Sequence, residues 1–255
     1  LYGREQEEAI LKSTFEEVVR QRAPRRPKFL LISGAGGTGK TRLGESLRSH
    51  VTKAGGYFCS GKFDQHQDDQ FAPLCASFNS YVMQILQEDE ETIRAARLRI
   101  RSALEGDLCS LIKMIPPLKL LMCEDLQRSN SIQDECTRCN QKQGRSIFAL
   151  HKLMRSICSP ERPMVMLLDD IQWATRCPLQ KWRAMINDDM NEGIMFVGIC
   201  RNDVAATSEA SSFLRNLEEQ DHIAITNVTI GNLKKEDIED MINEILLLPA
   251  DQAQS

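Results

Sequence analysis

The sequence of 255 residues predicts an α/β fold in which a parallel sheet of five strands lies between two layers of helices. Two observations support this prediction. Apolar runs of strand length alternate with stretches whose apolar residues recur at helical spacing. This order is typical of parallel strands that are buried on both faces. In addition, a glycine-rich segment separates the first apolar run from a helical pattern, which predicts a tight turn at the carboxyl end of that strand.

The elements follow in a regular order along the chain. The first is an amphipathic helix over 5–20, followed by a basic linker broken by proline over 23–27. Strands are expected over 29–32, 57–63, 164–168, 194–200 and 223–230. Helices are expected over 43–51, 74–85, 147–157, 178–190 and 238–245, and over 90–127 with a break at Pro116 and Pro117. Residues 128–144 are polar and lack periodicity, which predicts a mobile loop.

The glycine-rich segment is a full match to the phosphate-binding loop G-x-x-x-x-G-K-[ST]. The match comprises Gly34, Ala35, Gly36, Gly37, Thr38, Gly39, Lys40 and Thr41. Glycines allow positive φ and leave room for phosphate oxygens, and the exposed N–H groups before a helix form an anion cradle. Lys40 would contact the β- and γ-phosphates and Thr41 would ligate Mg²⁺, with Arg42 next to them in the nucleotide site. A chance glycine turn is the alternative, but the strand before it and the helix after it favour a three-layer P-loop NTPase.

Two acids follow the apolar strand at 164–168. We expect Asp169 to hold Mg²⁺ and Asp170 to orient or deprotonate the attacking water. The alternative is a solvated strand end. Arg201 follows the next strand, where ligands gather in parallel sheets, so its guanidinium could reach the γ-phosphate. The alternative is a surface arginine in a turn with Asn202 and Asp203.

Composition narrows the function classes. A formal net charge of −4 gives no support for a nucleic-acid footprint, and no apolar run approaches the length of a membrane span. We expect a cytoplasmic protein whose nine cysteines are reduced thiols. The pair Cys136-x-x-Cys139 could be half of a zinc site, but no second pair at matching spacing completes it. The chain begins at Leu1, which suggests a fragment of a longer polypeptide.

Several segments together resemble a known family. These are Leu1-Tyr2-Gly3-Arg4-Glu5, the strand at 56–65, the run Leu167-Leu168-Asp169-Asp170-Ile171-Gln172-Trp173-Ala174, the strand end at 200–202 and the turn at 230–233. The chain resembles the AAA ATPase module of the STAND class, also described as an origin-recognition-complex-like AAA domain, in the subgroup linked to sensor kinases. One departure is Thr175, where that subgroup usually has Asp. In addition, the segment contains no complete lid and no obvious arginine finger.

The resemblance implies a domain organisation and a set of ligands. Residues 1–230 would form the ATPase core, in which 1–27 are the adenine-side segment and linker, and 231–255 would begin a helical lid. Gly3 and Arg4 would line the adenine pocket. ATP, ADP and Mg²⁺ would bind between core and lid, and the nucleotide state would set the arrangement of attached signalling domains. No membrane or nucleic-acid partner is implied, and an oligomer could form on activation.

The sequence offers four candidate functions. The first is a Mg-ATP-binding, slowly hydrolysing ATPase module that acts as a regulatory switch. The second is an adaptor that binds nucleotide without hydrolysing it. A DNA-binding initiator is disfavoured by the pI of about 5.7 and by the lack of a winged helix. A small-molecule kinase would need a substrate site in the helical region 75–125, where no motif for one is found.

Overall fold

The computed structural model describes residues 1–20, 27–66, 69–104, 106–122, 143–203, 208–239 and 242, with the backbone alone for 143–147. Two elements precede the phosphate-binding loop, α1 (Glu5–Arg20) and β1 (Lys28–Gly34). The following elements are α2 (Lys40–Glu45), α3 (Leu47–Lys53), β2 (Tyr57–Lys62), α4 (Ala72–Ile85), α5 (Glu90–Ala103), α6 (Leu108–Met114), α7 (Leu118–Leu121) and α10 (Gln143–Ile157). The last are β3 (Met164–Asp169), the 3-10 turn η1 (Ile171–Trp173), α11 (Arg176–Ile186), β4 (Ile194–Arg201), α12 (Glu209–Glu218) and β5 (Ala224–Ile230).

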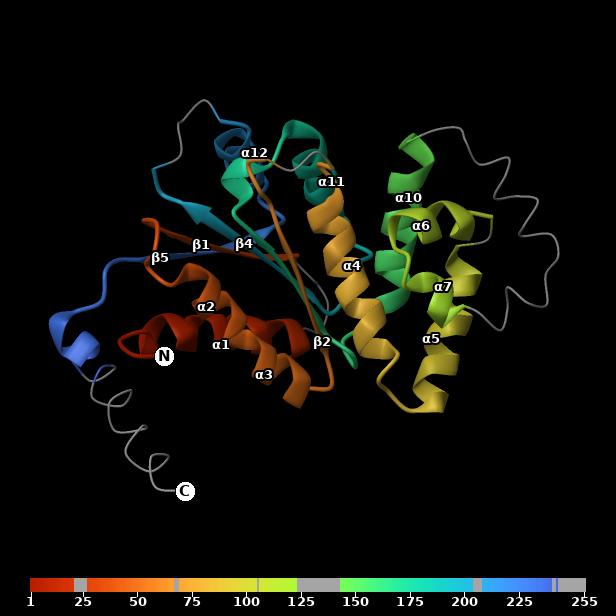
Figure 1. Ribbon diagram of the computed structural model, residues 1–255, viewed down its shortest axis with the longest axis horizontal. Coiled ribbons are helices and arrows are strands. Elements are labelled where there is room, and N and C mark those ends of the chain that lie inside the picture. The colour runs from red at the N-terminus through yellow and green to blue at the C-terminus, as the bar shows by residue number, and fades with distance from the viewer. Residues whose placement is uncertain are drawn as a thin grey trace, which may run out of the picture.

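The five strands form one parallel sheet in the order β2-β3-β4-β1-β5. Helices α1, α2 and α3 cover one face, while α4, α11 and α12 cover the other (Figure 1). The predicted three-layer α/β architecture with five parallel strands is therefore confirmed. In a parallel sheet all carboxyl ends lie at one edge, so the segments that follow β1, β3 and β4 come together there.

Each central strand contributes to two hydrophobic cores because neighbouring residues point to opposite faces. Phe29 packs into the core under α4, α11 and α12, where its ring lies 5.5 Å from Trp182 and 6.0 Å from Phe213 between centroids. Leu30 packs into the other core, against Leu11 of α1 and Leu43 of α2. This double burial explains why the strands read as continuous apolar runs, and it fixes their register.

Helix α12 was not predicted from the sequence. Ser208 caps it, since its hydroxyl accepts a hydrogen bond from the Ser211 amide, and the buried residues are Ala210, Phe213 and Leu217. The cap and the helical spacing were both readable in the sequence. The helical pattern was missed because the helix is only 10 residues long and its first turn is polar.

Other predictions fall at the edge of the described chain. Residues 123–142 lie outside the described residues, and so does most of the predicted loop, while α10 begins at Gln143. Most of the last predicted helix also lies outside them, although residues 235–239 are helical.

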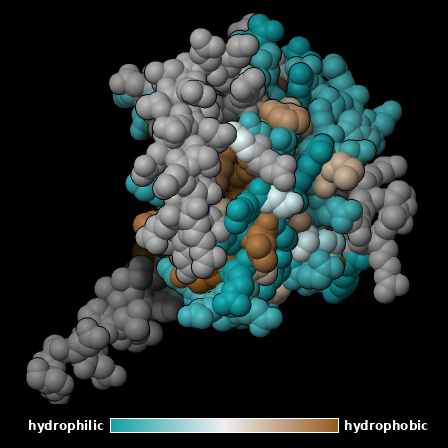
Figure 2. Space-filling model, turned by 90° about the vertical axis from the view of Figure 1, so that its right-hand side faces the viewer, coloured by the Kyte–Doolittle hydropathy of each residue, from teal (hydrophilic) through white to brown (hydrophobic). Residues whose placement is uncertain are grey.

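A further group of helices extends the layer that carries α4. Helices α5, α6, α7 and α10 pack beside one another at the right of Figure 1, and the Asp89 carboxylate caps α5 through the Thr92 amide at 2.9 Å. Figure 2 views this side, where hydrophobic side chains surface between hydrophilic ones. No helix in the described part of the chain is both long and apolar enough to cross a membrane.

Candidate nucleotide-binding site

The phosphate-binding loop connects the carboxyl end of β1 to the first turn of α2. Gly37 and Gly39 have φ of 78° and 90°, in the left-handed region. A Cβ at either position would meet nothing within 4 Å, so backbone conformation rather than space requires glycine there. The loop therefore turns back on itself with an open outer side.

Lys40 begins α2, and its side chain folds over the loop. Its Nζ donates to the carbonyl oxygens of Gly34 at 3.0 Å and Ala35 at 2.5 Å, and the residue is 7% exposed. The hydroxyl of Thr38 donates to the same Ala35 carbonyl at 2.9 Å. The loop is thus held in shape by its own side chains, and the Lys40 ammonium lies against its backbone carbonyls.

Thr41 and Asp169 meet although 128 residues separate them in the sequence. The Thr41 hydroxyl donates to Asp169 Oδ2 at 2.7 Å, and the amide of Asp170 donates to Asp169 Oδ1 at 2.8 Å. Asp169 is 2% exposed. Burial raises the pKa of this carboxyl, and the Thr41 hydrogen bond opposes that shift in part. A buried carboxylate beside a hydroxyl oxygen is a donor set that suits Mg²⁺.

Asp170 leaves the strand and turns away from Asp169. Strand β3 ends at Asp169, and Asp170 has φ 53° and ψ 43°, the left-handed conformation. Its Oδ2 lies 3.0 Å from the Nζ of Lys62 at the end of β2, and its Oδ1 accepts from the Gln172 amide nitrogen at 2.8 Å. The two neighbouring acids therefore have different partners.

Arg201 lies next to the phosphate-binding loop but is paired elsewhere. It stands opposite Gly34 in the β1–β4 register, and its guanidinium carbon would lie 3.9 Å from a Cβ built on Gly36. The guanidinium donates to both carboxylate oxygens of Asp203, at 2.9 Å and 2.5 Å. The ion pair with Asp203 raises the pKa of Arg201. The turn contact considered in the sequence analysis is present, and it lies beside the site rather than away from it.

Arg4 connects the start of the chain to the phosphate-binding loop and to the turn after β5. Its guanidinium donates to the carbonyl oxygens of Thr38, at 3.2 Å, and Gly231, and it pairs with Glu7 at 3.3 Å. Arg4 is 8% exposed, and Gly3 before it has φ 60°. These contacts place the two residues between the phosphate-binding loop and the turn after β5. Arg42, by contrast, is exposed on α2.

Sequence reasoning did not assign two residues that contact the site. Lys62 pairs with Asp170, and the Gln172 carbonyl oxygen accepts from the Arg201 amide at 3.3 Å, so Gln172 links the ends of β3 and β4. Both positions lie inside segments that carry the family resemblance, which was the available signal. Thr175, where the subgroup usually has Asp, precedes α11 without a side-chain cap and donates to Gln70 Oε1 at 2.7 Å instead.

The cysteines give no metal site in the described part of the chain. No disulfide is formed by the described cysteines, Cys59, Cys75, Cys109, Cys158, Cys177 and Cys200. Cys136 and Cys139 lie outside the described residues. Among the described residues, no group of three or more His, Cys, Asp or Glu side chains could hold a metal ion.

Comparisons with known proteins find similarity to a histidine kinase and to several solved structures. Histidine protein kinase 1 of Candida albicans is 27% identical over 172 residues, which cover 62% of this chain and only 7% of that protein. The crystal structure of Cdc6p from Pyrobaculum aerophilum is similar to 94% of this chain and 48% of its own, with 14% identity and a TM-score of 0.47. The plasmid coupling protein TrwB in complex with ADP and Mg²⁺ matches 80% of this chain and 75% of its own, with 13% identity and a TM-score of 0.31.

A family match covers most of the sequence. The model of the family described as "AAA ATPase domain" matches residues 1–197, a stretch that contains the phosphate-binding loop, both acids, the first three strands and the first half of β4. The chain therefore belongs to the AAA ATPase domain family.

Proposed function

We propose that this chain is a Mg-ATP-binding, slowly hydrolysing regulatory module that works as a nucleotide-operated switch in a larger signalling protein. The observation that carries the proposal is the bond between Thr41 on α2 and Asp169 on β3, formed at the end of an intact phosphate-binding loop. A hydroxyl and a carboxylate at this position are the oxygen ligands that Mg²⁺ would use beside a nucleotide.

The electrostatics of Asp169 fit a bound cation. A buried carboxylate is disfavoured unless a positive charge compensates it, and burial already raises the pKa of this one. Thr41 supplies a hydrogen bond but no charge. Mg²⁺, held by Thr41 and Asp169 directly or through water, would supply the compensating charge.

The phosphates have a matching cradle. Lys40 Nζ rests on two loop carbonyls, Gly34 and Ala35, and phosphate oxygens would offer it a stronger, charge-assisted partner. The open turn at Gly37 and Gly39 leaves the outer side of the loop free of Cβ atoms. We therefore assign nucleotide binding to 34–42, with Gly3 and Arg4 beside it.

Hydrolysis would depend on Asp170. Its carboxylate stands one residue beyond the metal-side acid and faces different partners, as a residue that orients water requires. Arg201 would reach the γ-phosphate only by leaving Asp203. Since arginine fingers accelerate phosphoryl transfer by about 10³–10⁵, a module that keeps Arg201 paired would hydrolyse slowly.

Residues 1–230 would be the ATPase core and 231–255 the start of a helical lid. Arg4 supports this division, because it joins the loop at Thr38 to the turn at Gly231 where the lid would begin. The relative in Candida albicans is named a histidine kinase and is far longer than this chain, which is consistent with attached signalling domains.

A non-hydrolysing adaptor is the second candidate. The observation that favours it is that both oxygens of Asp170 are already occupied, one by Lys62 and one by Gln172. If these bonds persist with nucleotide bound, Asp170 cannot accept a proton from water.

Single-turnover phosphate release at saturating ATP and Mg²⁺ separates the two candidates. Asp170→Asn should keep ATP affinity and lower the rate by about 10²-fold or more, the scale expected for losing a general base. Asn tolerates the left-handed backbone at this position, so the turn should survive. Asp189→Asn, an exposed acid far from the site in sequence, is the matched control. Equal rates in wild type and Asp170→Asn would make Asp170 structural, and no detectable rate in either would favour the adaptor.

A further inference from the structure

A cavity of about 690 Å³ lies between α5 and α10, away from the nucleotide site. It extends to Cys158 and Ser159, which precede β3, so it opens near the amino ends of the strands. The phosphate-binding loop lies at the carboxyl ends. Six strand residues separate these edges by about 20 Å. The cavity is therefore no extension of the ATP site.

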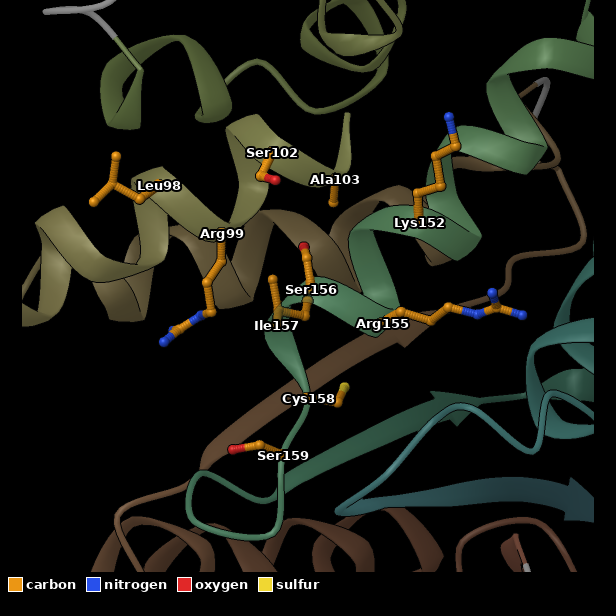
Figure 3. A pocket seen from close by; sticks show the side chains of 10 residues that line it. All are labelled: Leu98, Arg99, Ser102, Ala103, Lys152, Arg155, Ser156, Ile157, Cys158 and Ser159. Atoms are coloured by element: carbon orange, nitrogen blue, oxygen red, sulfur yellow. The ribbon is translucent and has the colours of Figure 1, made fainter. Parts of the chain in front are cut away.

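Apolar atoms form most of the cavity wall, beside the hydroxyls of three serines and the cations Arg99, Lys152 and Arg155. Leu98 and Ala103 of α5 and Ile157 of α10 line it, and Leu98 is 60% exposed. The stems of Lys152 and Arg155 complete the wall, while their charged ends point away from the centre of the cavity (Figure 3). A volume within about 300–1,000 Å³ and mostly apolar walls are typical of small-molecule sites.

Two of the cations around the cavity are already neutralised. Lys152 pairs with Asp107 at 3.0 Å, and Arg155 binds Asp188 with two bonds of 2.8 Å. Arg99 differs, because it is exposed and forms no hydrogen bond or ion pair with any residue that the structure describes. In Figure 3, Arg99 and the hydroxyl of Ser159 point to the same side of the cavity. One end of the cavity therefore carries a positive charge that is not paired.

A second cation lies behind that end. The Arg162 amide donates to Ser159 Oγ at 3.2 Å, and among the described residues its guanidinium donates only to neutral hydroxyls, those of Tyr57 and Thr92, both at 3.0 Å. Both Arg99 and Arg162 act electrostatically on the Tyr57 hydroxyl. Glu88 acts on it as well but forms no ion pair with either arginine in the described chain. The two guanidinium groups together make this end attractive to an anion.

A buried hydroxyl lies on α4, behind the lining of the cavity. The hydroxyl of Tyr81 is buried and has no partner among the described residues. Its electrostatic neighbours include Arg99 and Cys158, two residues of the cavity wall. Burial raises the pKa of Tyr81, so the hydroxyl stays protonated and can donate. The Tyr81 hydroxyl does not line the cavity, so the recognition of an anion falls to Arg99.

We propose that the cavity between α5 and α10 binds a small organic monoanion, with a carboxylate near Arg99 and an aliphatic body along Ala103 and Ile157. Unpaired positive charge is found at one end of the cavity, which fits one carboxylate. An acidic peptide would need further cations, but Lys152 and Arg155 are already paired with Asp107 and Asp188. The site is independent of the nucleotide and would give the module a second input.

Calorimetric titration with octanoate, below its micelle concentration, tests the proposal. Octanoate should bind to wild type and equally to Lys40→Ala, while octanol and acetate should bind at least about tenfold more weakly because each lacks one half of the recognition. Arg99→Gln should weaken octanoate binding by about tenfold or more, and Arg94→Gln, an exposed arginine on the same helix, should not. Ala103→Trp should block the cavity.

Several outcomes would overturn the proposal. These are no binding of octanoate at millimolar concentration, equal binding by Arg99→Gln and wild type, or equal binding of octanol and octanoate. Displacement of octanoate by a polyglutamate peptide that binds more tightly would make the cavity part of a protein-binding surface instead. Lys40→Ala changes the phosphate-binding loop and leaves this cavity intact. A failure of octanoate to bind would therefore not contradict ATP binding, and a failure of ATP to bind would not contradict octanoate binding.

Discussion

Lys62 Nζ lies 3.0 Å from Asp170 Oδ2, so the ends of neighbouring strands β2 and β3 are joined by an ion pair beside the phosphate-binding loop. The hydrogen bond and charge of Asp170 raise the pKa of Lys62, which keeps the ammonium protonated. A cation at this distance competes with water for the carboxylate on which hydrolysis would depend. Lys62 is mostly exposed, so the pair itself adds little stability.

Lys62→Met should raise the single-turnover rate of phosphate release by about 1.4- to fivefold. Exposed ion pairs contribute about 0.2–1 kcal/mol, and 1.4 kcal/mol corresponds to a factor of ten in rate. Lys53→Met, at the end of α3, is the matched control and should leave the rate unchanged. A lower rate in Lys62→Met would show that the lysine assists the reaction instead of restraining Asp170.

Asp169→Asn should weaken Mg-ATP binding by about 10–100-fold and metal-free ATP binding much less, because the amide keeps the hydrogen bond to Thr41 but carries no charge for Mg²⁺. Titrations with and without Mg²⁺ measure the two losses. Equal losses would place Asp169 outside the metal shell.

The same substitution should stabilise the protein without ligand at neutral pH. Burial raises the pKa of Asp169 in the folded protein above its unfolded value of about 3.9. The folded state therefore loses stability as pH rises through the window between the two pKa values, and the loss is absent below about pH 4. Urea unfolding from pH 4 to 8 should show the advantage of Asp169→Asn growing with pH to a plateau. If wild type and Asp169→Asn differed by the same free energy of unfolding at every pH, the charge of Asp169 would not be what destabilises the folded protein.

Arg4→Ala should lower the free energy of unfolding by about 1–3 kcal/mol, since it leaves the carbonyls of Thr38 and Gly231 without their charged donor. Arg4→Lys should recover only part of the loss, because an ammonium lacks the guanidinium fork that reaches both carbonyls. Denaturant unfolding without nucleotide measures both variants. An effect below about 0.5 kcal/mol for Arg4→Ala would mean that water replaces the arginine at no cost.

Local patterns in the sequence predicted most of the fold and the centre of the site. The loop from Gly34 to Thr41 and the strand before Asp169 are contiguous, so their geometry follows from the order of residues. The order of strands depends on packing between distant segments, which puts β1 between β4 and β5. The same limit hid the Lys62–Asp170 pair, because no local rule says which strand ends lie side by side.

Contacts of long side chains were the least predictable part. Arg201 was expected to turn toward the phosphates, and its position opposite Gly34 fits that expectation, but Asp203 two residues later offers a nearer partner. Arg4 stays a prediction for the adenine side, and in the structure its guanidinium contacts the carbonyls of Thr38 and Gly231, which no local pattern predicts. A flexible side chain settles on whichever partner the finished fold brings closest.

The most direct test of the central claim is the melting temperature of wild type and Lys40→Ala with Mg-ATP at about 100 times the dissociation constant. Wild type should gain about 2.7 kcal/mol, which corresponds to a rise of about 5–10 °C for a domain of this size. Lys40→Ala should lose most of that rise, while Lys53→Ala should keep it. An equal rise in wild type and Lys40→Ala, or no rise in wild type, would contradict nucleotide binding at the phosphate-binding loop.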